Sequence, residues 1–501
     1  MSYVRTPASP TRRPGISQAL AADRLGVPSV VIFVLSAATP LTVVAGVVTT
    51  GYATTGLTGI PVAFLAIGVA LALFCVGYVA MARHVANAGA FYAYISRGIG
   101  RPVGVAGAWV ALAAYNALQV GLYGAVGAAA SPLLSQWFGV DVAWWVIALV
   151  AWAIVAVLGL QDVDVNGKVL AVLLIAEVAV ILVYSFADLA NPAGGTIDVT
   201  PLVDLGALVG PGVGALFGLA VLGFVGFESA VVFSEEARDP HRTVRIAIYL
   251  SVAVTAGLYA LSSWAMSVAT GPDQIVDASR TQGTELVFNL AGAHMGSTLV
   301  DIGHTLFVTS VLAAMISFHN TTARYAFALG RERVLPAVLG RTSPRTGSPK
   351  VGSLLQTGIG FVVIVTYALA GWDPVVQLFF WGGSSGGLGV LLLIATTAVA
   401  VLVYFARRPS GETLWRRAIA PTLAAFAMLL VSVLALVNFA TLLGVPEDSP
   451  LRWGVPITYL IIAALGIGWG LVLRTSRPEV YNAIGLGAKT AASDTALDDR
   501  A

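Results

Sequence analysis

Residues 210–240 form an apolar stretch long enough to cross a bilayer, yet this stretch carries a carboxylate near its middle. Gly223 and Gly226 stand just before Glu228 and weaken a helix there, because each glycine costs roughly 1 kcal/mol relative to alanine. A charge at this depth costs roughly 3 kcal/mol or more. Irregular backbone at membrane depth is tolerated only where it is buried in protein or lines a water-filled cavity. The segment therefore predicts a broken helix beside a polar cavity.

Similar apolar runs recur along all 501 residues, of which 57% are hydrophobic and 10% are charged. Soluble domains carry about 25% charged residues, so this composition predicts an all-α polytopic membrane protein. Runs of about 20 apolar residues predict 12 transmembrane helices. They cover residues 28–50, 60–82, 103–129, 142–159, 169–187, 209–233, 244–269, 297–329, 351–370, 375–405, 419–443 and 454–473. The single Cys75 lies inside one run and leaves no disulfide or cysteine metal site.

The basic residues predict the orientation of these spans. Of the 27 lysines and arginines, all but Arg280 and Arg452 fall on one side, which the positive-inside rule assigns to the cytoplasm. Residues 1–27 are then a cytoplasmic tail, which we expect to be disordered and without a cleavable signal, and residues 476–501 are a second one. We expect residues 84–100 to form a helix at the cytoplasmic interface and residues 272–295 to cap the outer mouth.

A second break is predicted in the first span. Pro40 stands mid-membrane in the run Ser36–Thr42, where it removes a helical hydrogen bond and clashes with the preceding turn. The two breaks lie five spans apart, and five is odd, so the second group of five spans must enter the membrane upside-down. Residues 28–188 and 209–406 are therefore predicted inverted repeats, with two further spans at 415–475. Paired breaks in inverted repeats indicate a transporter's substrate site.

Two motifs carry a family resemblance. The runs FVGFES at 224–229 and EEARDP at 235–240, together with RYAFALGRERVLP at 324–336, resemble the amino acid–polyamine–organocation (APC) permeases over roughly residues 28–475. The resemblance implies the leucine-transporter (LeuT) fold, with five-plus-five inverted repeats and discontinuous helices one and six around the substrate. It also implies transport of amino acids or related amines by proton symport or exchange. The run around Pro40 departs from the glycine-rich stretch of many relatives.

The candidate substrate site lies at the two breaks. A half-helix beginning near Pro40 is expected to direct its N-terminal amides at a substrate carboxylate. Carbonyl groups near residues 222–225 are expected to meet the ammonium, and two phenylalanines to form an apolar wall or gate. The candidate residues are Ala37, Ala38, Thr39, Pro40, Leu41 and Thr42 of the first span, Tyr115, Asn116 and Gln119 of the third, and Phe224, Val225, Gly226, Phe227 and Ser229 of the sixth. The polar stripe of the third span either contacts the substrate's side chain or bonds neighbouring helices. Each phenylalanine either forms the wall or packs in the core or against lipid.

Two intramembrane acids are candidates for proton or ion coupling. The resemblance implies that Glu228 titrates during transport, as a glutamate at this motif position does in some relatives; the alternative is a permanently protonated carboxyl that pins helix six. Glu177 lies where several relatives carry a lysine, so it either carries a proton, helps to bind a cation, contacts a cationic substrate or has a structural role. Thr309 and Ser310 supply hydroxyls of the kind that line cation sites, although lone hydroxyls often bond their own helix.

Two further features are left open by the sequence. Glu235 and Glu236, with Arg238, Arg331 and Arg333, either form an inside gate of ion pairs or remain solvated surface charges worth little. The four glycines of residues 382–387 permit either close helix packing or a local break.

These features together favour a secondary transporter that moves an amino acid across the cytoplasmic membrane by alternating access, coupled to protons. The alternatives are a polyamine or amine transporter, an amino acid exchanger, and a sensor with a transporter fold. No phosphate-binding G-x-x-x-x-G-K-[ST] motif and no H-E-x-x-H motif is present, so we expect no enzyme activity, cofactor, metal or nucleic acid. The expected partners are a small substrate, protons and the lipid bilayer.

Overall fold

We describe a computed structural model of residues 20, 23–85, 87–161, 163–408 and 411–487. Apart from one bridge between Leu25 and Ala237, these residues form helices and connections, which confirms the all-α prediction. Eleven of the described helices are long and apolar enough to cross a membrane. The helix Trp144–Gly159 is apolar but has 16 residues, so the predicted total of 12 spans remains a prediction.

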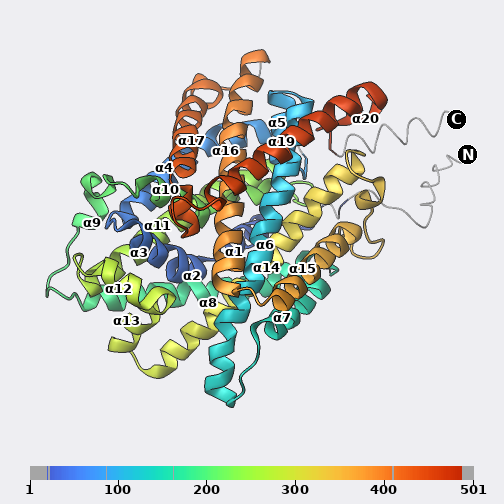
Figure 1. Ribbon diagram of the computed structural model, residues 1–501. Coiled ribbons are helices and arrows are strands. Elements are labelled where there is room, and N and C mark those ends of the chain that lie inside the picture. The colour runs from blue at the N-terminus through green and yellow to red at the C-terminus, as the bar shows by residue number, and fades with distance from the viewer. Residues whose placement is uncertain (1–19, 21–22, 86, 162, 409–410, 488–501) are drawn as a thin grey trace, which may run out of the picture.

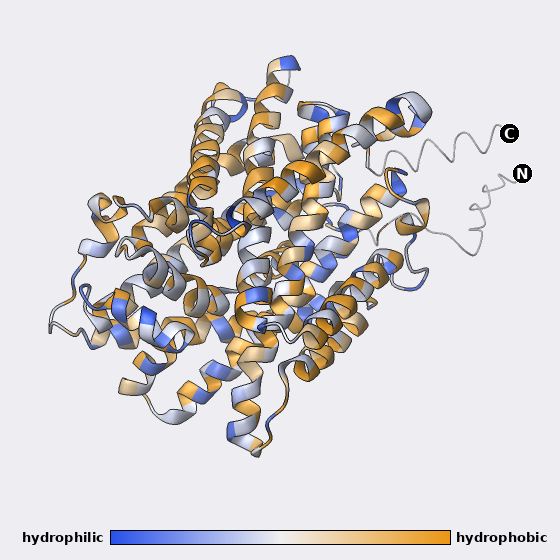
Figure 2. Ribbon diagram, in the orientation of Figure 1, coloured by the Kyte–Doolittle hydropathy of each residue, from blue (hydrophilic) through white to orange (hydrophobic). Residues whose placement is uncertain are grey.

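The eleven spans and the shorter α7 follow one another along the chain, with further short helices in several of the connections, and we number them in this order. In order they are α1, α2, η1 and α3 (Val27–Thr55), α4 (Ile60–Ala82), α6 (Arg101–Phe138), α7 (Trp144–Gly159), α8 (Val163–Ala190), α10 with η3 (Val213–Val231), α11 (Pro240–Thr270), α14 (Ser297–Arg331), α15 (Lys350–Ala370), η6 with α16 (Pro374–Arg407), η7 with α17 (Trp415–Val437) and α19 (Leu451–Ser476). Figure 2 shows hydrophobic residues along these helices and most strongly hydrophilic ones near their ends and connections.

The first span is broken where the sequence predicts it. α1 (Val27–Ala37) ends before Thr39, and α2 (Pro40–Thr42) starts at Pro40, continuing through the π-helical η1 (Val43–Val48) into α3 (Thr49–Thr55). Proline suits the first position of a helix, since its missing N–H has no partner there. Thr39 has φ 44°, a left-handed conformation that is rare for a β-branched residue. Such strain persists only where the surroundings fix it, often at functional sites.

The sixth span is broken as well. α10 (Val213–Phe224) ends at an extended Val225, and the 3-10 helix η3 (Phe227–Val231) begins after Gly226. Gly226 has φ 119°, which a residue without Cβ adopts at little cost. The break therefore has a local chemical cause, as at Pro40.

The long helix α6 runs through the middle of the bundle beside α14, α16 and α19 (Figure 1). Two glycines of α16 (Trp381–Arg407) allow a close approach: a Cβ on Gly382 would lie 2.8 Å from the Ala117 oxygen, and one on Gly386 2.7 Å from the Ala114 oxygen. α16 is continuous there, so of the two readings of this glycine-rich segment the structure favours packing.

Both described ends of the chain lie at one end of the bundle (Figure 1). We call it the arginine-rich end, because Arg24, Arg238, Arg324 and Arg331 lie there. The first part of the predicted tail, residues 1–19 and 21–22, lies outside the described residues. Its last part is docked, which corrects the expectation of disorder: the amides of Arg24 and Leu25 donate to the Glu236 oxygen, and the amide of Arg238 donates to the Leu25 oxygen. The second tail forms α20 (Pro478–Ala483), and residues 488–501 lie outside the described part.

The predicted interfacial segment 84–100 does contain a helix, α5 (Phe91–Gly98). However, Phe91, Tyr92 and Tyr94 are fully buried, because α5 packs against α6 and α16 rather than lying on lipid. At the opposite end of the bundle lie α9 (Thr200–Val203), η2 (Leu205–Leu208), α12 (Ile275–Gln282), η4 (Gly283–Glu285), α13 (Leu286–His294) and α18 (Phe439–Leu443). There α12 and η4 pack against α3, and α13 packs against α14 and α8.

Candidate functional site

A cavity of about 80 Å³ lies beside the two breaks. Its walls come from the first, third, sixth, eighth and tenth spans and from α18, and they are apolar except for threonine and serine hydroxyls. The lining residues are Ala37, Ala38, Thr39, Thr42, Val43, Gly46, Val47, Thr50, Leu118, Leu122, Leu219, Leu222, Val225, Phe318, Phe379, Phe380, Gly383, Ser384 and Leu442. No charged side chain is among them.

The two breaks touch each other behind this cavity. A Cβ built on Gly226 would lie 2.7 Å from the Ala37 Cβ and 3.2 Å from the Ala38 nitrogen. The hydroxyl of Tyr259 on α11 donates to the Ala38 oxygen at 2.9 Å, so a carbonyl freed by the first break is satisfied. The two irregular segments therefore form one contiguous unit.

Glu177 on α8 holds the start of α2. Its Oε1 accepts hydrogen bonds from the Leu41 amide at 2.5 Å and from the Ser310 hydroxyl of α14 at 2.6 Å. The Thr42 hydroxyl lies 3.1 Å from the Ser310 hydroxyl. A carboxylate at a helix N-terminus is stabilised by the exposed amides and the helix dipole. Glu177 thus connects the first, fifth and eighth spans, and it takes the amide that the sequence assigned to a substrate carboxylate.

Glu228 makes the equivalent contact in the sixth span. Its Oε2 accepts from the Gly226 amide at 3.0 Å, and its Oε1 accepts from the Tyr115 hydroxyl of α6 at 2.6 Å. The hydroxyl of Ser229 donates to the Gly226 oxygen at 2.6 Å. Glu228 is fully buried and does not line the cavity. It fastens the second break to the third span.

The structure divides the candidate residues into two groups. Five of them line the cavity: Ala37, Ala38, Thr39, Thr42 and Val225. Pro40, Leu41, Tyr115, Asn116, Gln119, Phe224, Gly226, Phe227 and Ser229 lie around it instead. Among the coupling candidates, Ser310 bonds to Glu177, whereas the Thr309 hydroxyl donates to the Leu306 oxygen of its own helix at 3.1 Å.

The third-span stripe and the two phenylalanines point away from the cavity. Asn116 donates to the Leu112 oxygen of its own helix at 2.8 Å, and the Gln119 amide lies 3.5 Å from the Tyr123 hydroxyl. The Phe224 ring packs 6.2 Å from that of Phe64, between centroids, and the Phe227 ring packs 6.1 Å from that of Phe74. The two phenylalanines pack against neighbouring rings and the two amides bond within α6, so none of them forms the cavity wall.

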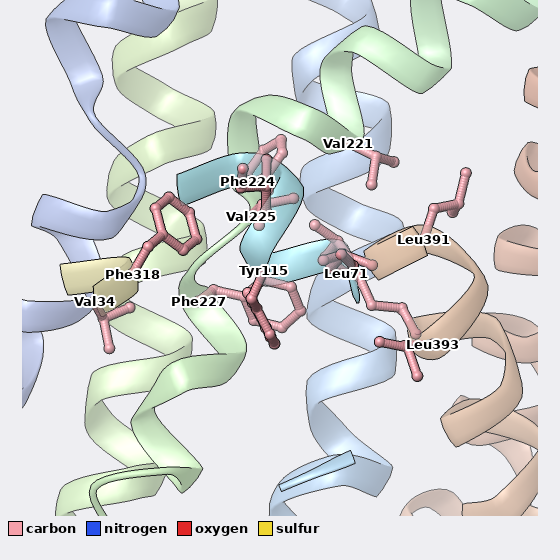
Figure 3. Close-up of a cluster of buried hydrophobic side chains, with 14 of the residues drawn as sticks. Val34, Leu71, Tyr115, Val221, Phe224, Val225, Phe227, Phe318, Leu391 and Leu393 are labelled. Atoms are coloured by element: carbon pink, nitrogen blue, oxygen red, sulfur yellow. The ribbon is translucent and has the colours of Figure 1, made fainter. Parts of the chain in front are cut away.

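Three aromatic wall residues are missing from the sequence-based candidates: Phe318, Phe379 and Phe380. Figure 3 shows Phe318 beside Val225, in the space between the first and sixth spans. The only sequence signal for Phe379 and Phe380 is their place directly before the glycine-rich start of α16. Phe318 follows Ser310 by eight residues on α14 and so lies on a similar face, about two turns on.

The arginine-rich end is closed by buried ion pairs. Arg324 on α14 binds Glu236 with its Nε at 2.6 Å and its Nη2 at 3.0 Å, and both side chains are 1% exposed. Arg331 binds Glu235 through two contacts of 2.7 Å. Of the two readings from the sequence, solvated charges are wrong for Glu235, Glu236 and Arg331, whose side chains are at most 10% exposed. Arg238 and Arg333 are exposed. A buried pair is costly to break, since one charge is left uncompensated.

The opposite end is more open. A second cavity of about 300 Å³ lies there, lined in part by Thr54, Arg280 and Gly444. It shares Thr50, Phe380 and Leu442 with the smaller cavity. A thin layer of side chains therefore separates the central cavity from this end of the bundle.

The family model described as amino acid permease matches residues 25–467. The chain belongs to the amino acid permease family. This match confirms the resemblance to APC permeases drawn from residues 224–240 and 324–336. The predicted discontinuous spans lie within the matched region.

The individual relatives align with only part of this chain and at low sequence identity. It is 28% identical to an uncharacterized transporter of Mycobacterium tuberculosis over 268 residues, which cover 54% of this chain and 56% of the relative. It is 26% identical to the low-affinity putrescine importer PlaP of Escherichia coli over 342 residues, covering 64% and 71%. It is 25% identical to the chloroplastic cationic amino acid transporter 7 of Arabidopsis thaliana over 269 residues, covering 48% and 42%. The match thus spans little more than half of the mycobacterial relative.

Proposed function

We propose that this permease imports a neutral amino acid with an apolar side chain, driven by protons and working by alternating access. The observation that carries the proposal is the central cavity, whose walls supply threonine and serine hydroxyls but no charged side chain. Leu118, Leu122 and Phe380 surround the space for the substrate's side chain. A charged side chain there would lose its hydration without gaining a partner, which is strongly unfavourable.

The backbone at the breaks supplies the polar contacts in this proposal. Carbonyl groups at the end of α10, at residues 222–224, face the substrate's ammonium from the negative end of a helix. The substrate's carboxylate lies near Ala38 and Thr39, where Thr39 and Thr42 line the cavity. Each contact serves the part common to all amino acids, and the apolar wall selects the side chain.

A diamine is the second candidate, favoured by the relative named as a putrescine importer. A diamine carries two ammonium groups, and each of them needs a negatively charged hydrogen-bond acceptor. The two nearest acids, Glu177 and Glu228, do not line the cavity and already accept hydrogen bonds from backbone amides. The cavity therefore supports an amino acid better than a diamine.

We assign the proton to Glu177 rather than to Glu228. Glu228 bonds within its own break and to the third span, whereas Glu177 joins α2 to α8 and α14. Hydrogen bonds to an ionised acceptor are roughly twice as strong as neutral ones. A proton on Glu177 therefore weakens its hold on the Leu41 amide and releases α2, which couples the proton to movement of the first span.

The movement follows from the predicted inverted repeats, residues 28–188 and 209–406, with the arginine-rich end facing the cytoplasm. In the closed state, the ion pairs of Arg324 and Arg331 block that end while the thin layer at Phe380 covers the cavity. Opening the layer admits the substrate; breaking the ion pairs then releases it on the other side.

The test is uptake of radiolabelled leucine, phenylalanine, arginine, glutamate and putrescine into proteoliposomes, with and without an inward proton gradient. We expect gradient-stimulated uptake of the apolar amino acids only. Glu177→Gln is expected to lose the stimulation and keep exchange, and the exposed Glu479→Gln serves as the matched control. Putrescine or arginine as the preferred substrate would overturn the substrate class. Stimulation that survives in Glu177→Gln and disappears in Glu228→Gln would move the proton to Glu228.

A further inference from the structure

Asp188 is a second buried acid on α8 that none of the contacts above explains. It lies 11 residues after Glu177, which is about three helical turns, so the two acids share a face roughly 16 Å apart along the axis. Its side chain is 1% exposed. Its Oδ1 has no hydrogen-bond partner among the described residues, and none of the ion pairs found there includes it. Burying such a group without a partner is unfavourable.

A small cavity of about 10 Å³ adjoins Asp188, which is space for about one water molecule. Its walls are Leu41, Val44, Ile181, Tyr184, Ser185, Asp188, Ser262, Met266 and Val287. The hydroxyls of Ser185 and Ser262 lie 3.1 Å apart within it. Leu41, whose amide binds Glu177, forms the wall on the side of that glutamate. The cavity therefore adjoins Asp188 directly and Glu177 through Leu41.

The groups around this cavity are nearly all neutral. Its only other titratable lining residue is Tyr184, whose hydroxyl donates to the Leu299 oxygen at 2.7 Å. Asp301 and His304 follow Leu299 on α14, and His304 lies 2.9 Å from Glu285, which precedes α13. The facing parts of α11 and of the first span contribute serine, methionine, leucine and valine.

We propose that Asp188 is a second proton-binding group of the transport cycle, which loads a proton from the end opposite the arginine-rich end and passes it to Glu177. A proton leaves external water for the Asp188 carboxylate. It then moves to the Glu177 carboxylate along a chain of water molecules that enters when the first span moves, one of them held by the Ser185 and Ser262 hydroxyls, and Asp188 returns to its ionised form. Leu41, Val44 and Ile181 close the path in the present state. Leu41 and Val44 belong to the first span, so movement of that span opens the path.

This inference rests on the proposed proton coupling, and Asp188→Asn tests it. Gradient-driven uptake is measured against external pH in oriented proteoliposomes, alongside exchange without a gradient. We expect Asp188→Asn to need a several-fold higher external proton concentration for half-maximal uptake while its exchange rate stays that of the wild type. Ser262→Ala, a smaller change, is expected to slow gradient-driven uptake alone. Asp273→Asn, an exposed acid at the same end, is the control and should match the wild type.

Two outcomes would overturn the inference. Wild-type pH profiles in both Asp188→Asn and Ser262→Ala would show that no proton passes this cavity. Equal loss of uptake and exchange in both variants would make Asp188 a structural residue. If uptake by the wild type does not respond to the proton gradient, the proposed proton coupling itself is refuted. That outcome is distinct from the two above, because it is seen before any variant is compared.

Discussion

Gly226→Ala probes the contact between the two breaks. The new Cβ would lie 2.7 Å from the Ala37 Cβ and 3.1 Å from the Ala37 carbonyl carbon, where ordinary contacts are 3.4–4 Å. Gly226 also has φ 119°, which alanine rarely adopts. The substitution therefore strains the sixth-span break and pushes the first-span break away from it.

The two costs can be added to give an order of magnitude. A left-handed conformation costs an L-residue roughly 1–2 kcal/mol. Forcing an extra methyl group into a packed site costs about 1–3 kcal/mol. We therefore expect Gly226→Ala to destabilise the protein by about 2–5 kcal/mol. Because the strain is relieved by moving residues that line the central cavity, we also expect a raised KM for the substrate.

Thermal unfolding of the purified protein and the KM for uptake measure these effects. Gly257→Ala on α11 is the matched control, because nothing lies within 4 Å of its Cβ and a helical alanine is favoured by roughly 0.5–1 kcal/mol. Gly223→Ala should fall between the two, since its Cβ would lie 3.0 Å from the Phe64 ring. A Gly226→Ala protein with the Tm and KM of the wild type would refute the contact between the breaks.

Three further predictions concern the closed end, the cavity wall and the C-terminal segment. Arg324→Ala leaves Glu236 buried without its cation, which costs about 3–5 kcal/mol, and hydrogen exchange should become faster in residues 233–238. Leu122→Asp places an acid in the wall, so competition assays should show weaker binding of apolar amino acids and new binding of putrescine. Burial raises the pKa of Glu332 above its ordinary value, although bonds from Tyr92, Gly485, Gly487 and Asn87 lower it. Its contribution to folding is present at acid pH and lost as pH rises through the folded-state pKa, so the Tm of the wild type should fall relative to Glu332→Gln towards alkaline pH.

The sequence predicts the two breaks because each has a local cause. Pro40 cannot continue a helix, and Gly226 beside Glu228 cannot sustain one at membrane depth. No local feature of the sequence marks the residues that line the cavity. Phe318 and Leu122 are ordinary apolar residues of apolar helices, and which face of α14 or α6 meets the cavity depends on neighbours far away in the chain. For the same reason the sequence leaves Tyr115 open between contact with the substrate and a bond between helices, and the structure shows the bond between helices, from Tyr115 to Glu228.

The closed end shows the same limit for charges. Glu235 and Glu236 follow the sixth span in a run that reads equally well as a solvated surface loop. The partner of Glu235 is Arg331, 96 residues later, and the partner of Glu236 is Arg324, 88 residues later. Only the docking of α14 beside the end of the sixth span, under residues 24–25, removes these groups from water. The burial of a charge is therefore a property of the assembled bundle, whereas the presence of the charge is a property of the sequence.

The same reasoning explains how two acids persist at membrane depth without a cation beside them. Each lies at the start of the second half of a broken span: Glu177 receives the Leu41 amide, and Glu228 receives the Gly226 amide. A helix start carries unpaired N–H groups and a partial positive charge, so a carboxylate and a break stabilise each other. Breaking a helix in a membrane and burying an acid there are each unfavourable alone. When the broken helix and the buried acid lie together, the unpaired N–H groups and the carboxylate stabilise each other. One proton added to the carboxylate removes much of this stabilisation.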